Sequence, residues 1–297
     1  MAIGSTSISL VLGAGGARGL AHIGVIRELE RRGYRIEAIA GSSMGALVGG
    51  IYGMGELESY AEWVGGLDQT DVLRLLDWTL AGGGLIRGRR IIDKLRELTG
   101  ESDIEHLGID FTAVAVDLDR GREVWMNRGS LFDAIRASIA IPGVFTPHHY
   151  RGRTLVDGGL LNPVPVAPTL STVTDLTVVV DANATAVEPP PLAAPAEDDT
   201  AGGRLEMLRD FLGSRDDNTR PAVDTPPGLS AVLSRSLETM QAAITRHHLA
   251  VFRPDVVIGI PKNACMVHEF HRARPMIDLG RRLTAEALDS AHPGHHD

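Results

Sequence analysis

The sequence predicts an α/β fold, a three-layer α/β/α sandwich with a mostly parallel central sheet. Two observations support this prediction. First, the chain contains short apolar runs, most of which end in Gly or Asp as buried strands do: SISLVLG, IEAIAG, FTAVAVD, LTVVVD and DVVIGI. Second, stretches with helical spacing of apolar residues lie between these runs, for example at residues 18–32, 87–99 and 130–139. Alternating strands and helices are typical of a sheet covered by helices on both faces.

Size and charge set the broad class of the protein. With 297 residues, of which 43% are hydrophobic, the chain can bury a sizeable core, and we expect one domain over residues 5–290. The formal net charge is -9, from 29 basic and 38 acidic side chains. This balance does not indicate a nucleic-acid partner, although it leaves a local basic patch open.

The single cysteine, Cys265, cannot form an intramolecular disulfide, and no Cys/His spacing indicates a zinc site. We therefore expect no metal or cofactor and a reducing compartment, the cytoplasm. The first residues lack the basic start of a secretory signal. No segment approaches the ~20 apolar residues that span a bilayer. Contact with lipid is expected only from the aqueous side, at the inner face of the membrane. The sequence does not indicate an oligomeric state.

One segment interrupts the alternating pattern. Residues 183–228 hold seven of the 16 prolines and few aromatic residues, which predicts a long loop or flexible insert. Within it, Leu205, Leu208 and Leu212 have helical spacing. Two interpretations stay open for this stretch, a short surface helix and a mobile lid. Beyond the insert, residues 229–252 and 276–290 are each predicted to form an amphipathic helix.

The stretch IAGSSMGALVGG places two serines between an apolar run and a run of small residues. Ser43 is flanked symmetrically by Gly41 and Gly45, and Gly-x-Ser-x-Gly is the pattern of a nucleophile on a sharp turn between strand and helix. The glycines have a steric role, because side chains at these positions would collide with the adjoining strand and helix. Ser42 lies off the centre of the pattern. Ser43 is therefore the candidate nucleophile.

A glycine-rich turn, within LVLGAGGARGLAHIGVI, lies near the N-terminus between a predicted strand and helix. Such turns expose backbone N–H groups that suit either a phosphate or the oxyanion of acyl transfer. A dinucleotide site normally has an acidic residue about 20 positions further on, at the end of the second strand. Here that strand ends in the Ser43 turn, and Glu37 lies at its start. The pattern favours an oxyanion site over a phosphate site.

A third motif, GRTLVDGGLLNPVPV, places Asp157 at the end of a short predicted strand, followed by two glycines. Alone, it would be an ordinary Asp-Gly turn. Together, GAGGARG, GSSMG and DGG, in that order, resemble the motif set of the patatin-like phospholipases, particularly the small bacterial branch. The segment AIRASIAIPGVFTP also resembles this family.

The resemblance implies a Ser-Asp dyad in place of a triad, with Ser43 as the nucleophile and Asp157 as its base. It implies an oxyanion hole formed by the backbone amides of Gly15, Gly16 and Arg18. Many relatives carry glycine where this chain has Ala14. Because an aspartate with a pKa near ~3.9 is a weak base towards a serine hydroxyl, burial has to raise the pKa of the base.

The activity implied by the resemblance is the hydrolysis of lipid carboxylic esters through an acyl-enzyme, as by a phospholipase A, lysophospholipase or esterase. The expected partners are a lipid or lysophospholipid substrate and a membrane surface, with no nucleic acid and no metal.

Two other interpretations stay open. A Ser-His-Asp triad would draw its imidazole from the histidines downstream of Asp157, namely His247, His248, His268 and His271. Against it, Ser43 follows only one earlier strand, which is unusual for an α/β-hydrolase. For His148 and His149 we expect structural roles. The second interpretation is a lipid-binding or regulatory module that keeps the fold with little or no activity.

Overall fold

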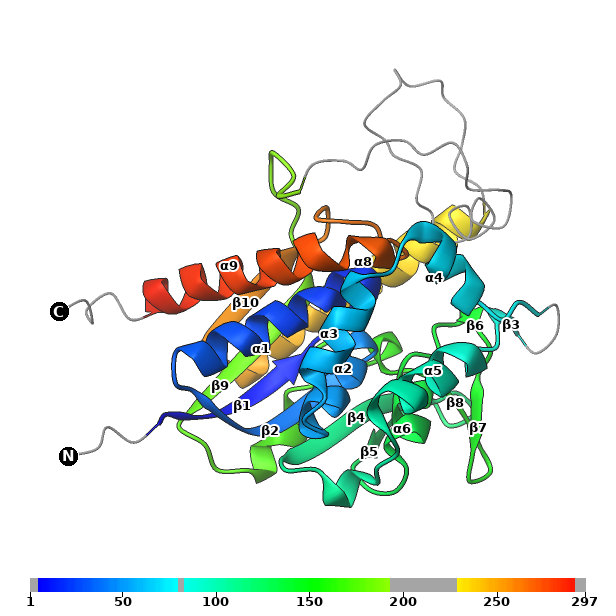
Figure 1. The fold of residues 1–297 in the computed structure, drawn as a ribbon, viewed down its shortest axis with the longest axis horizontal. Coiled ribbons are helices and arrows are strands. Elements are labelled where there is room, and N and C mark those ends of the chain that lie inside the picture. The colour runs from blue at the N-terminus through cyan, green and yellow to red at the C-terminus, as the bar shows by residue number, and fades with distance from the viewer. Residues whose placement is uncertain (1–4, 80–82, 193–228, 292–297) are drawn as a thin grey trace.

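The computed structural model describes residues 5–79, 83–192 and 229–291. Within these residues, eight strands form the main sheet, in the order β10-β9-β1-β2-β4-β8-β7, with β5 paired to β4 (Figure 1). Five neighbouring strands are mutually parallel: β10 (Val256–Pro261), β9 (Leu176–Ala184), β1 (Ser7–Leu12), β2 (Arg35–Ser42) and β4 (Asp110–Asp117). They coincide with the five apolar runs, so the prediction of a mostly parallel sheet is confirmed.

Antiparallel strands extend the sheet beyond β4. They are β5 (Arg122–Met126), β7 (His148–Tyr150) and β8 (Arg153–Asp157). A separate parallel pair is formed by β3 (Gly84–Ile86) and β6 (Gly143–Phe145). Among these, the sequence predicts only β8, through the Asp157 motif that ends it, because all of these strands are short and none is a long apolar run.

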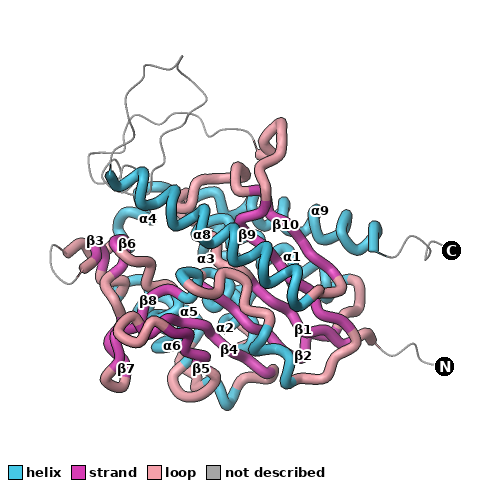
Figure 2. The backbone as a smooth tube through the Cα atoms, turned by 180° about the vertical axis from the view of Figure 1, so that it is seen from behind, coloured by secondary structure: helices cyan, strands magenta, loops and turns pink. Residues whose placement is uncertain are grey.

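Helices cover both faces of the sheet. The α-helices are α1 (Ala21–Arg31), α2 (Met44–Gly53), α3 (Leu57–Gly65), α4 (Gln69–Leu75), α5 (Arg89–Thr99), α6 (Leu131–Ser138), α8 (Leu229–Phe252) and α9 (Ala273–Ala291). Short 3₁₀ turns are η1 (Gly16–Leu20), η2 (Ile104–His106), η3 (Gly158–Leu160), η4 (Ala167–Ser171) and η5 (Phe270–Arg272). α1, α2 and α9 lie over one face (Figure 1), and α8 crosses the other (Figure 2).

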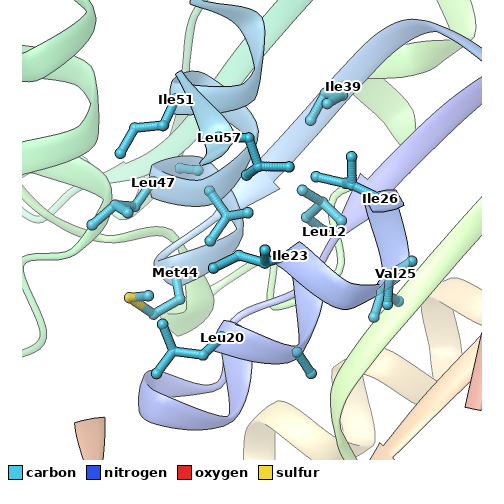
Figure 3. Close-up of a cluster of buried hydrophobic side chains, with 14 of the residues drawn as sticks. Leu12, Leu20, Ile23, Val25, Ile26, Ile39, Met44, Leu47, Ile51 and Leu57 are labelled. Carbon is cyan, nitrogen blue, oxygen red and sulfur yellow. The ribbon is translucent and has the colours of Figure 1, made fainter. Parts of the chain in front are cut away.

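The core lies on both sides of the sheet, because successive strand residues point to opposite faces. On one side, Leu12 and Ile39 pack under α1 and α2, which contribute Ile23 and Leu47 among others (Figure 3). On the other side, Val11 belongs to a second cluster under α8: Val11, Val164, Val166 and Val179, with Leu249 and Phe252 against them. Burial on both faces explains why the second half of β1, Leu10 to Leu12, is continuously apolar.

Two predicted helices after the insert are confirmed. The stretch 229–252 is α8, and the stretch 276–290 lies within α9. Residues 193–228, with Leu205, Leu208 and Leu212, lie outside the described residues, so the surface-helix and lid interpretations are not tested. None of the helices in the described ranges is long and apolar enough to span a membrane.

Candidate active site

Ser43 lies at the sharp turn where β2 ends and α2 begins. Its backbone has φ 55° and ψ -122°, which is unfavourable for a residue with a side chain. A Cβ atom at Gly41 would overlap the backbone of Gly45 and Ala46, and one at Gly45 would overlap the Leu12 carbonyl. The predicted steric role of the two glycines is confirmed.

Ser138, the last residue of α6, links this turn to β4 by hydrogen bonds. The Ser43 N–H donates to Ser138 Oγ (2.9 Å), and the Ser138 hydroxyl donates to the Val114 carbonyl in β4 (2.6 Å). Ser138 has no exposed surface. No sequence motif points to this residue. The available signal is a serine between apolar residues in the stretch IRASIAIPG.

The register of β4 brings Asp157 to Ser43. One edge of β4 pairs with β2, where Val114 lies opposite Ser42. The next residue, Ala115, lies opposite Asp157 in β8. β5 occupies the other edge of β4 at the same positions, so the ends of β2 and β8 meet along one edge of β4, although 114 positions separate Ser43 from Asp157 along the chain.

The two side chains are in direct contact. The Ser43 hydroxyl donates to Asp157 Oδ2 (2.6 Å), and the Gly159 N–H donates to Asp157 Oδ1 (2.7 Å). Both side chains are almost fully buried, since Ser43 is 3% exposed and Asp157 is 4% exposed. A Cβ atom at Gly158 would overlap the Val114 carbonyl, so glycine is required for this close approach.

Burial changes the acidity of the carboxyl group. Removal from water raises the pKa of Asp157 to about 7, against the opposing effect of the hydrogen bonds from Ser43 and Gly159. The direction is the one expected from the sequence. A carboxylate with a pKa near neutrality is a much better proton acceptor than one in water.

The glycine-rich turn between β1 and η1 lies beside Ser43, and Gly16 lines the same cavity as the serine. Gly16 has φ 54°, and a Cβ atom there would lie 2.6 Å from the Val267 carbonyl oxygen. The Ala17 N–H donates to that carbonyl (2.9 Å), and the Arg18 N–H donates to the Gly15 carbonyl (3.2 Å). Across the described residues, the N–H groups of Gly15 and Gly16 have no protein acceptor.

Three side chains hold the carbonyl groups of this turn. They are His22 Nε2 on the Gly13 carbonyl (2.8 Å), Asn183 Nδ2 on the Ala14 carbonyl (2.7 Å) and Arg18 Nε on the Gly15 carbonyl (3.2 Å). Burial lowers the pKa of His22 to about 4, so its ring is neutral and Nε2 carries the proton that the carbonyl accepts. Arg18 also reaches the Lys262 carbonyl (2.8 Å). These side-chain roles were not found from the sequence.

An apolar cavity opens at Ser43. It holds about 1080 Å³ of empty space, including open solvent at its mouth. Ser43, Met44 and Gly16 form one part of its wall. The rest comes from α2, α3, α4, β3, α5, η5 and the segments 139–145 and 267–268, with side chains such as Leu47, Tyr60, Val64, Val72, Leu95 and Phe145. Such a lining suits a hydrocarbon chain better than a polar group.

The histidines considered for a triad are scattered. His247 is exposed, and His248 contacts the Val164 carbonyl (3.3 Å) and the ring of Phe252. His268 lines the cavity. His271 lies in η5.

The remaining polar candidates do not line the cavity at Ser43. His148 pairs with Asp133 (3.1 Å), and His149 is an exposed residue of β7. Within residues 5–79, 83–192 and 229–291, no three His, Cys, Asp or Glu residues cluster so that they could bind a metal ion. Glu37 pairs with Arg35 at the start of β2, the end of the strand opposite the glycine-rich turn.

Comparisons with known proteins identify the class. The family model for patatin-like phospholipases matches residues 10–170. Two proteins named as uncharacterized NTE family proteins, from Mycobacterium tuberculosis and Mycobacterium bovis, are 39% identical to this chain over 333 aligned positions. The alignments cover 96% of this chain and 92% of each relative.

Two further matches are more distant. Lysophospholipase nte1 of Emericella nidulans is 30% identical over 169 positions, which cover 54% of this chain and 11% of that protein. Among solved structures, VipD from Legionella pneumophila matches with a TM-score of 0.46 and 13% identity, over 97% of this chain and 67% of that one. The sequence matches define a carboxylic ester hydrolase. The chain belongs to the patatin-like phospholipase family.

The contact between Ser138 and the turn can be tested directly. Ser138→Ala leaves the Ser43 N–H and the Val114 carbonyl without this partner, and an unsatisfied buried group costs about 1–3 kcal/mol. Because the affected N–H belongs to Ser43, the candidate nucleophile, we expect kcat on an activated ester to fall by about tenfold to a hundredfold, with little change in KM.

The matched control is Ser130→Ala, at the other end of α6. Ser130 caps the helix by accepting from the Asp133 N–H (3.3 Å), so its loss should cost about 1 kcal/mol of stability without changing kcat. Thermal unfolding and steady-state kinetics measure both effects. Equal kcat values for the two variants would contradict the positioning role of Ser138.

Proposed function

We propose that the chain hydrolyses lipid carboxylic esters with Ser43 as the nucleophile and Asp157 as its base. The observation that carries this proposal is the buried hydrogen bond of 2.6 Å between Ser43 Oγ and Asp157 Oδ2. In a Ser-His-Asp triad, an imidazole lies between the serine and the aspartate, which then do not touch. Direct contact therefore supports a dyad over a triad.

In the proposed reaction, the Ser43 oxygen attacks the ester carbonyl while its proton passes to Asp157 Oδ2. The tetrahedral intermediate collapses, Asp157 returns the proton to the leaving alcohol, and an acyl-enzyme remains on Ser43. Asp157 then takes a proton from water, which attacks the acyl-enzyme, and returns this proton to Ser43 Oγ as the ester bond breaks and the fatty acid leaves. The pKa of about 7 supports this double role, because a group close to neutrality both accepts and returns a proton.

The proposed oxyanion hole is the glycine-rich turn. The N–H groups of Gly15 and Gly16 have no acceptor in the described part of the chain, and the turn begins next to the nucleophile. Arg18 was assigned to the same hole from the family resemblance. Its N–H donates to the Gly15 carbonyl, so we propose that Arg18 supports the hole chiefly through its buried guanidinium. Fixed donors of this kind stabilise the charge that develops in the transition state.

The apolar cavity supports an acyl chain as the group next to the scissile ester. Its wall is almost wholly hydrocarbon, and Ser43 lies at its edge. A phospholipid, a lysophospholipid or a simple fatty ester presents such a chain, and the name of the relative lysophospholipase nte1 points the same way. The contact with a membrane that such substrates require is part of the proposal. A binding module without catalysis is the alternative, and the pairing of Ser43 with a buried base argues against it.

Substitutions of the dyad test the proposal. Asp157→Asn should lower kcat on long-chain p-nitrophenyl esters and lysophospholipids by about 10²- to 10⁴-fold, the usual contribution of a positioned base. Ser43→Ala, which removes the nucleophile itself, should lower kcat by at least as much. His268→Gln, a change in the same cavity, should keep activity within about threefold of wild type, a difference of less than 1 kcal/mol.

Circular dichroism and thermal unfolding confirm that each variant is folded. If His268→Gln, or a substitution of His247, His248 or His271, is as damaging as Ser43→Ala, a triad replaces the dyad. If the wild type turns over none of these esters, the binding module is correct.

The acyl cavity is tested by narrowing it. Val72 lines the cavity from α4, whereas Arg74 on the same helix points to solvent. Val72→Trp should reduce kcat/KM for a palmitoyl ester by at least about tenfold and leave a butyryl ester nearly unchanged, because lost apolar contact is worth about 1–3 kcal/mol per group. Arg74→Trp, the control, should affect neither ester. Equal losses on the two esters in Val72→Trp would contradict an acyl site in this cavity.

A further inference from the structure

A second cleft is lined by arginines. It lies between α5, α6 and the residues that follow β6, and it shares no lining residue with the cavity at Ser43. Its empty space is about 1090 Å³, including open solvent. The charged and titratable residues that line it are Arg87, Arg89, Asp93, Arg96, Asp133, Arg136 and His148. Four guanidinium groups gather here, although the whole chain has a net charge of -9.

Arg136 is the buried member of the cleft, with 7% of its surface exposed. Its Nε and Nη2 donate to the Arg87 carbonyl (3.1 and 2.6 Å), and Nη2 also donates to the Thr146 carbonyl (2.7 Å). Its Nη1 is buried and, in the part of the chain that the structure describes, has no acceptor. A buried donor without a partner is costly, and a guanidinium keeps its charge inside the protein. The Arg136 Nη1 group can therefore donate to an anionic ligand in the cleft.

The acidic groups around the cleft each have a partner within the cleft or at its edge. Asp93 lies 3.8 Å from Arg96, and Asp133 accepts from His148 (3.1 Å). Asp77 is the carboxylate whose charge acts on Arg136. It accepts the N–H groups of Gly88 (2.7 Å) and Arg89 (3.0 Å), at the start of α5.

The rim carries the free positive charge. Arg87 and Arg89 are both exposed and, among the described residues, neither side chain forms an ion pair. They follow each other around Gly88, within the sequence RGRR. Their guanidinium groups can therefore turn towards a ligand without breaking a contact. In the described structure, Arg96 is paired with Asp93 and Glu101, and the carboxylates of Asp77 and Asp133 lie beside Arg136 and His148. The unpaired charges at the rim are therefore those of Arg87 and Arg89.

We propose that this cleft binds a phosphate group. Guanidinium groups match the geometry of phosphate oxygens and bind them through paired, charge-assisted hydrogen bonds. Arg87 and Arg89 make the first contacts at the rim, and the buried charge of Arg136 strengthens binding because it lies in a medium of low dielectric constant. The phosphate comes either from a lipid headgroup at a membrane surface or from a soluble phosphate compound.

The position of the cleft gives this binding a consequence. Phe145 lines the cavity at Ser43, and the guanidinium carbon of Arg136 lies 5.8 Å from the centre of its ring. The arginine-lined cleft and the apolar cavity are thus neighbours, with Phe145 between Arg136 and the cavity. A lipid headgroup bound in the cleft would hold the Phe145 side of the cavity next to an anionic membrane surface. The binding itself does not depend on the chemistry at Ser43.

The test uses the full chain and the double variant Arg87→Gln/Arg89→Gln. The control, Arg122→Gln/Arg128→Gln, removes the same charge from exposed arginines in and after β5. Titration calorimetry with inorganic phosphate should give equal Kd values for the wild type and the control. The cleft variant should bind at least about tenfold more weakly, a difference of about 1.4 kcal/mol. Thermal unfolding confirms that both variants are folded.

Vesicle flotation distinguishes the two sources of phosphate. If the source is a headgroup, the wild type and the control float with phosphatidylcholine vesicles that contain phosphatidic acid, and the cleft variant does not. If the source is soluble, inorganic phosphate binding depends on Arg87 and Arg89, and vesicle binding is absent or equal in all three proteins. The proposal is overturned if neither probe binds the wild type, or if the cleft variant and the control bind both probes equally.

Discussion

The site depends on the hydrogen bond between Ser43 and Asp157, from which the surrounding structure excludes water. A carboxylate transferred from water into a protein interior loses solvation, which is why the pKa of Asp157 rises to about 7. Hydrogen bonds from the Ser43 hydroxyl and the Gly159 N–H compensate for part of the lost solvation of the carboxylate. The remaining penalty makes the carboxylate a stronger proton acceptor. The raised pKa of Asp157 is thus a consequence of the fold, chiefly of its burial.

Fixed backbone around the dyad keeps this arrangement in place. Ser43 has an unfavourable conformation that the β2-α2 junction imposes, and Ser138 ties its N–H to β4. In the glycine-rich turn, side chains of His22, Asn183 and Arg18 occupy three successive carbonyl groups. The N–H groups of Gly15 and Gly16 remain without a protein acceptor in the described structure. Preorganised donors need no rearrangement when charge develops.

The parts that were predictable from the sequence depend on short-range patterns. The five parallel strands are continuous apolar runs, and the glycines around Ser43 and after Asp157 mark turns that only small residues allow. Contacts between distant residues left no such pattern. Ser138 lies 95 positions from Ser43, and Asn183 lies 169 positions from Ala14. Their roles follow from strand order and register, which the sequence alone did not determine. The phosphate cleft likewise joins arginines from separate elements.

The pH dependence of acylation tests the central claim most directly. Below pH about 7, a carboxyl group with a raised pKa holds its own proton and cannot take one from Ser43, so the burst rate of acylation should rise with pH and level off above that value. The account predicts an apparent pKa of about 7 for this rise in the wild type, and its loss in Asp157→Asn together with most of the rate. A midpoint near ~4, the ordinary value for an aspartate, or an unchanged profile in Asp157→Asn, would contradict it.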